Sequence, residues 1–148
     1  MSFYEDKLFE IFENENHVCI SDDTDKYIQI LMKKFTFKRD FIDWNKNVND
    51  RISLHITCHD ENFLKRNIVS NLNLIFLEKI NKEDKIIYFN DNCFEQSLIF
   101  DNYTTLEKYL FQMTDNFVQR GYYMNPNADW CLLLRDTAII EFGFSSLI

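Results

Sequence analysis

The pattern that most restricts the fold lies in the last quarter of the chain. Two nearly apolar segments, residues 130–134 and 137–142, flank the polar pair Arg135-Asp136. Two short apolar segments joined by a polar pair predict a β-hairpin. Arms that are apolar at almost every position predict strands near the centre of a sheet, where both faces are covered. We therefore expect a terminal hairpin inside a larger sheet.

Glu141 interrupts the second arm of this hairpin. A carboxylate in a central strand requires a partner, and Arg135 across the turn is the expected one. A structural ion pair is the first interpretation, and a carboxylic acid with a raised pKa is the alternative.

The rest of the chain shows helical and strand periodicities in turn. Helices are expected over residues 3–14, from Ser21 to residue 34, from Asp60 to residue 73, and from Asn102 or Thr104 to Gly121. The alternative for the third is a helix that gives way to a strand near Leu72, and residues 74–77 fit either element. Strands are expected over residues 17–20, 35–37, 51–58, 85–90 and 94–100, the last two around a turn at 90–92. These elements predict a single domain over residues 1–148. Its class is α+β: a largely antiparallel sheet with N-terminal helices and a C-terminal β-hairpin.

Two of the helix starts carry capping signals. Ser2, with Glu5 three residues later, fits a capping box. Ser21 is expected to cap the second helix, because acidic residues crowd its first turn and favour the positive end of the helix dipole. The apolar stripe of that helix is expected at Tyr27, Ile28, Leu31 and Met32.

Two glycines and one proline occur among the 148 residues. Phosphate-binding loops need several glycines at fixed spacing, so neither a P-loop nor a dinucleotide fingerprint is present. The acidic start is unlike a signal peptide, and no segment approaches the roughly 18 consecutive apolar residues of a membrane span. We expect a cytoplasmic protein without a membrane segment. Its free thiols are expected to be buried: Cys19, Cys58, Cys93 and Cys131.

No cluster has the spacing of a known catalytic or metal site. His55, Cys58 and His59, even when joined by His17 and Cys19, lack the paired spacing of a structural zinc site. No glycine-rich elbow marks an activated cysteine. We therefore expect no metal, no cofactor and no catalytic residue. A small enzyme with a site assembled only in space is one alternative.

Residues 33–39 (KKFTFKR) interleave four positive charges with two rings. Such a segment can hold single-stranded nucleic acid by stacking and phosphate contacts. A net charge of −8 opposes that binding. A helix end leading into an edge strand explains the same residues, so we expect no direct nucleic-acid binding. A nucleic-acid-associated module using residues 33–39 is the second alternative.

Acidic charge is concentrated at one end of the chain. Residues 1–25 contain eight acidic residues and one lysine, whereas residues 26–148 carry a net charge of only −1. Charge of one sign steers a partner of the opposite sign, although acids near helix starts also stabilise helices and keep a surface soluble. If the charge is functional, the partner is basic. The predicted partner-binding residues are Glu10, Glu13, Glu15, Asp22, Asp23 and Asp25.

An acidic domain of this size without a catalytic motif resembles the immunity proteins of bacterial contact-dependent growth inhibition and other polymorphic toxin systems. The Trp-led hairpin of residues 129–143 (DWCLLLRDTAIIEFG) is also of a kind found in such families. The resemblance implies a protein that is not an enzyme. It would bind the C-terminal domain of a cognate toxin, expected to be a basic nuclease, and neutralise it by stoichiometric inhibition.

Overall fold

The computed structural model describes residues 3–90, 95–117, 120–136 and 138–147. Its main sheet consists of β1 (Val18–Ser21), β4 (Val48–His55), β5 (Ile86–Asn90), β6 (Ser97–Phe100), β7 (Gly121–Met124), β8 (Trp130–Arg135) and β9 (Ile139–Ser145). These seven strands are antiparallel, in the order β1-β6-β5-β7-β8-β9-β4. A separate hairpin pairs β2 (Phe37–Lys38) with β3 (Phe41–Ile42).

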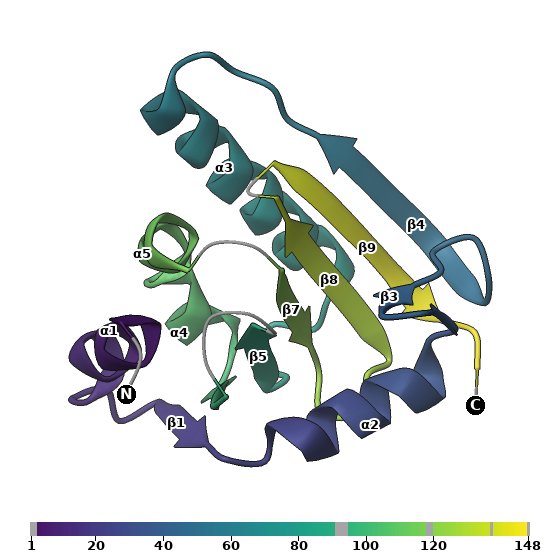
Figure 1. The fold of residues 1–148 in the computed structure, drawn as a ribbon, viewed down its shortest axis with the longest axis horizontal. Coiled ribbons are helices and arrows are strands. Elements are labelled where there is room, and N and C mark those ends of the chain that lie inside the picture. The colour runs from purple at the N-terminus through teal and green to yellow at the C-terminus, as the bar shows by residue number, and fades with distance from the viewer. Residues whose placement is uncertain (1–2, 91–94, 118–119, 137, 148) are drawn as a thin grey trace.

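Helices cover both faces of the sheet (Figure 1). One face packs against α1 (Phe3–Phe12), α3 (Glu61–Lys79), α4 (Tyr103–Glu107) and α5 (Leu110–Asn116). The other face packs against α2 (Thr24–Lys34) and the β2–β3 hairpin. Strand side chains alternate between faces, so Leu132 joins the first core and Leu133 the second.

The predicted hairpin of β8 and β9 forms and lies inside the sheet. β8 pairs with β7 on one side and β9 on the other, and β9 pairs in turn with β4. A strand with helices on both faces needs apolar side chains in both directions, which explains its composition. The structure confirms the α+β class, the largely antiparallel sheet, the N-terminal helices and the C-terminal hairpin.

The region after β6 differs from its prediction. The Asn102 side chain caps α4 by accepting from the Thr105 N–H at 3.0 Å, as expected. The helix is then interrupted, restarts as α5 and ends at Asn116. Gly121 does not end a helix but begins β7, a strand that the sequence did not predict. A Cβ atom at this position would lie 2.8 Å from Cε2 of Tyr88, so any larger residue would force the Tyr88 ring to move.

The start of α2 also needs correction. Ser21 is the last residue of β1, and the helix begins at Thr24 with Asp23 in the cap position. The Ser21 hydroxyl still stabilises the segment between β1 and α2, because it accepts a hydrogen bond from the Asp23 N–H at 3.0 Å. Tyr27 and Leu31 are buried as predicted, but 48% of Met32 is exposed.

Two long elements differ from their predicted bounds. The helix expected from Asp60 forms as α3, with the Asp60 side chain as its cap, and continues to Lys79, so residues 74–77 are helical. β4 begins at Val48 and ends at His55, three residues earlier at each end than predicted, with a bulge between Asn49 and Ile52. The predicted cap at Ser2, the turn at 91–92 and Cys93 lie outside the described residues.

Candidate functional site

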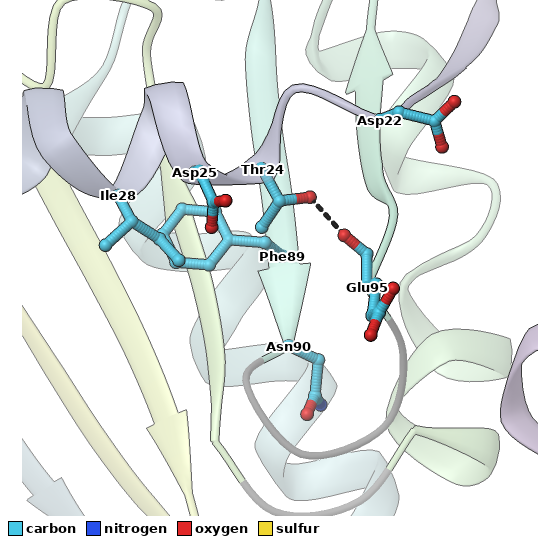
Figure 2. A pocket seen from close by; sticks show the side chains of 7 residues that line it. All are labelled: Asp22, Thr24, Asp25, Ile28, Phe89, Asn90 and Glu95. Atoms are coloured by element: carbon cyan, nitrogen blue, oxygen red, sulfur yellow. Dashed lines mark hydrogen bonds between the residues drawn. The ribbon is translucent and has the colours of Figure 1, made fainter.

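A pocket of about 380 Å³ lies at the beginning of α2 (Figure 2). Two of the predicted partner-binding residues, Asp22 and Asp25, line it. Glu95, from the segment leading into β6, adds a third carboxylate, and Ile28 and Phe89 supply apolar lining. The pocket thus combines negative charge with an apolar wall.

Pairing between β1 and β6 explains why these acids, far apart in sequence, line one pocket, although the Asp22 carboxylate points away from those of Asp25 and Glu95 (Figure 2). Ser21 lies opposite Ser97 in the antiparallel register, so the segments that flank the two strands meet at one end of the sheet. The Thr24 hydroxyl then donates to the Glu95 backbone carbonyl at 2.5 Å (Figure 2). This hydrogen bond ties the first turn of α2 to Glu95 across 71 positions of sequence.

The pocket carboxylates form no ion pair within the described chain. No lysine or arginine of the described residues lies within ion-pair distance of Asp22, Asp25 or Glu95. The nearest basic residue in sequence, Lys26, lies with its Nζ 5.8 Å from the centre of the Tyr27 ring. The positive end of the α2 dipole stabilises the acids only in part. The pocket can therefore accept a cationic group from another molecule.

The other predicted acids lie at the far end of β1, on and after α1 (Figure 1). Glu10 pairs with Lys7 at 3.7 Å. Glu15 accepts hydrogen bonds from the Tyr109 hydroxyl and from the His17 N–H. The hydrogen bond from Tyr109, and to a smaller extent that from the His17 N–H, lowers the pKa of Glu15. The hydrogen bond between Tyr109 and Glu15 also raises the pKa of Tyr109 to about 12. Glu15 thus takes part in internal contacts.

The predicted set therefore divides into two groups. Asp22 and Asp25 line the pocket, and Asp23 lies beside them at the cap position of α2. Glu10, Glu13 and Glu15 lie apart from it. Glu95 was missed, because only the pairing of β1 with β6 shows that it adjoins residues 22–25.

Glu141 has a different partner from the one predicted. Its carboxylate accepts from the Ser53 hydroxyl at 3.0 Å and lies 3.5 Å from Nη2 of Arg51. Arg135 instead pairs with Asp136 at 3.6 Å. The register explains the difference, since Ser53 lies directly opposite Glu141 on β4, whereas Arg135 lies opposite Ile139.

The thiols do not all follow the prediction of burial. Cys131 is buried, and burial raises the pKa of its thiol. Cys58 is partly buried, whereas Cys19, on the edge strand β1, is exposed. In the described part of the chain, no three histidine, cysteine or acidic residues gather as ligands for a metal ion.

Residues 33–39 do not form the two-ring platform suggested by their sequence. Phe35 is fully buried, with its ring centre 6.0 Å from that of Trp44. Lys34 pairs with Asp129 at 3.2 Å. The predicted strand at 35–37 begins only at Phe37, in the small hairpin. Phe35 is therefore unavailable for stacking on a base.

No protein-family model and no curated protein sequence matches this chain. None of the described helices has the length and apolar character needed to cross a membrane.

Proposed function

We propose that this protein is a stoichiometric inhibitor that binds and neutralises a cognate toxin domain. The observation that carries the proposal is the pocket of Asp22, Asp25 and Glu95, which has no cation of the described chain paired to its carboxylates. In the proposed complex, a basic side chain of the toxin enters this pocket. The protein acts by occupying that side chain and catalyses no reaction.

Arginine is the side chain that matches the pocket best. A guanidinium group is planar and donates hydrogen bonds in a fork that fits carboxylates. The carboxylates of Asp25 and Glu95 supply the acceptors, and the apolar lining includes Phe89, which is only 2% exposed. An arginine held in this way contributes charge attraction and charge-assisted hydrogen bonds.

A nuclease is the proposed class of toxin. Proteins that cleave nucleic acid hold phosphates with arginine and lysine, and a carboxylate can occupy the same donors. The acidic excess of residues 1–25 would speed the approach of such a basic partner. A nuclease toxin acts on nucleic acid inside the cell, so the proposed place of inhibition is the cytoplasm.

The test is a capture experiment with two variants of equal charge change. The pocket variant combines Asp22→Asn, Asp25→Asn and Glu95→Gln. The control combines Glu78→Gln, Glu83→Gln and Glu107→Gln, at acids outside the pocket lining. Tagged wild-type and control proteins should retain one basic protein in equimolar amount from the source cells at moderate salt. The pocket variant should lose it, with an unchanged melting temperature or a slightly higher one.

Two results would contradict the proposal. Equal retention by the pocket variant would show that the pocket is not the contact surface. Equal loss by both variants would show that only the net charge matters.

A further inference from the structure

A second cleft has the opposite charge. It has a volume of about 860 Å³ and lies between the β2–β3 hairpin and the strands β4, β8 and β9. Two carboxylates line it, those of Asp43 and Glu141. Its lining also includes five basic residues from separate segments of the chain: Lys38, Arg39, Lys46, Arg51 and Arg135. This is a local positive excess in a chain of net charge −8.

The two carboxylates are already bound by donors of the protein itself. Asp43 accepts from the Asn45 N–H at 3.1 Å, and Glu141 accepts from Ser53 and Arg51. By contrast, none of the described acidic residues lies within ion-pair distance of Lys38, Arg39 or Lys46. These three cations are available to an anionic ligand.

The backbone near the cleft includes left-handed conformations. Arg39, in the turn between β2 and β3, has φ 61°, and Asn47 and Asp50, which do not line the cleft, have φ values of 60° and 53°. Asparagine and aspartate adopt this conformation readily, whereas arginine rarely does, and rare conformations concentrate at binding sites. The bulge between Asn49 and Ile52 adds a residue to β4 beside Arg51. The turn thus holds Arg39 at a conformational cost.

An exposed aromatic ring completes the cleft. Phe41 is 48% exposed, and the guanidinium carbon of Arg120 lies 4.4 Å from the centre of its ring. A half-exposed ring in the same cleft as Lys38, Arg39 and Lys46 is an arrangement that can stack a base and contact its phosphate. A carboxylate-rich peptide would use the cations but not the ring. The volume also falls within the range of about 300–1,000 Å³ that is usual for small-ligand sites.

We propose that this cleft binds a nucleoside phosphate, either free or at the end of a single strand. The phosphate lies against Lys38, Arg39 and Lys46, and the base stacks on Phe41. The inference is independent of the toxin-inhibitor proposal, because the two pockets share no lining residue. It also differs from the platform that the sequence of residues 33–39 suggests, since buried Phe35 takes no part.

Calorimetric titration of the full chain at low salt tests the assignment. The probes are adenosine monophosphate, adenosine, inorganic phosphate, a short oligoadenylate and a polyglutamate peptide. Adenosine monophosphate should bind at least about tenfold more tightly than adenosine or phosphate alone, because only it uses both halves of the cleft. Tighter binding of oligoadenylate would assign the strand end as the natural source, and tighter binding of the monomer would assign the free nucleotide.

Three variants locate the binding site. Arg39→Asn with Lys46→Gln should weaken binding of adenosine monophosphate about tenfold, and asparagine tolerates the left-handed backbone at position 39. The matched control, Lys82→Gln with Lys85→Gln, changes exposed lysines outside the cleft and should have no effect. Phe41→Leu should weaken binding of the nucleotide but not of inorganic phosphate.

Any of four results would overturn the inference. These are no binding of either adenylate probe, equal loss in the lysine control, no effect of Phe41→Leu on nucleotide binding, and polyglutamate binding as tight as that of adenosine monophosphate.

Discussion

At the scale of single residues, Glu141 shows how this protein accommodates a charge inside its sheet. Its side chain is only 6% exposed and depends on Arg51 and Ser53 for its partners. Removing the cation from a buried pair leaves an uncompensated charge, which costs more than the pair itself contributes. Because Arg51 is 37% exposed, water would compensate part of that loss.

Arg51→Met should therefore lower the free energy of unfolding by about 1–3 kcal/mol, as measured by urea denaturation at neutral pH. The control is Arg66→Met, at an exposed arginine on α3 that forms no ion pair with any of the described residues. A loss in Arg51→Met no larger than in the control would contradict the role assigned to this pair.

Glu15 and Tyr109 provide a pH-dependent contact. The hydrogen bond from Tyr109, with that from the His17 N–H, lowers the pKa of Glu15 below its usual 4.5. A lowered carboxylate pKa contributes stability that is present above pH 4.5 and is lost as the pH falls through the folded-state pKa. The raised pKa of Tyr109 contributes stability that is fully present below pH 10 and is lost as the pH rises through about 12.

Tyr109→Phe should accordingly be less stable than wild type at pH 7, and the difference should shrink as the pH falls well below 4.5. Urea midpoints of both proteins across this acidic range would measure it. A difference that stays constant with pH would show that the hydrogen bond to Glu15 contributes nothing to the stability change.

At the scale of elements, two aspartates at helix starts have different structural roles. Asp60 and Asp23 both occupy the cap position of a helix. The Asp60 side chain accepts from two backbone N–H groups, at 3.0 and 3.2 Å, whereas the Asp23 side chain accepts from none of the described ones. Asp60→Ala should cost about 0.5–2 kcal/mol of stability by urea denaturation, and Asp23→Ala clearly less. Equal costs would contradict the assignment of the α3 cap.

The Tyr88 ring leaves little room for a side chain at Gly121. Gly121→Ala should cost about 1–3 kcal/mol, because the new methyl group would meet the Tyr88 ring in a well-packed core. The penalty should shrink in a Tyr88→Leu background, which a double-mutant cycle would measure. An unchanged penalty would mean that Tyr88 is not the obstacle.

Local patterns predicted some elements well and others not at all. The apolar arms of β8 and β9 and the start of a helix at Asp60 depend on neighbouring residues, so the sequence alone predicted them. β7 was missed because its glycine looks like a helix end, and only the Tyr88 ring, 33 positions away, explains it. The Arg51–Glu141 contact similarly depends on strand order and on a bulge that no local pattern shows.

At the scale of the whole molecule, charge is sorted into two clefts of opposite sign. The acidic pocket lies at the start of α2, and the basic cleft lies against β4, β8 and β9. The sequence revealed the acidic excess of residues 1–25, because that excess is local. It could not reveal Glu95 as its neighbour, nor the meeting of Lys38, Lys46 and Arg135, because the fold alone brings these segments together.

The proposed complex depends on the acidic pocket, so titrating the toxin's activity is the most direct measurement. The nuclease activity of the captured partner would be followed against increasing amounts of wild type, the pocket variant and the Glu78, Glu83 and Glu107 control. Wild type and control should abolish activity at one equivalent. The pocket variant should bind about 100-fold or more weakly and require a large excess, since it loses several charge-assisted contacts. Complete inhibition by one equivalent of the pocket variant would contradict the account.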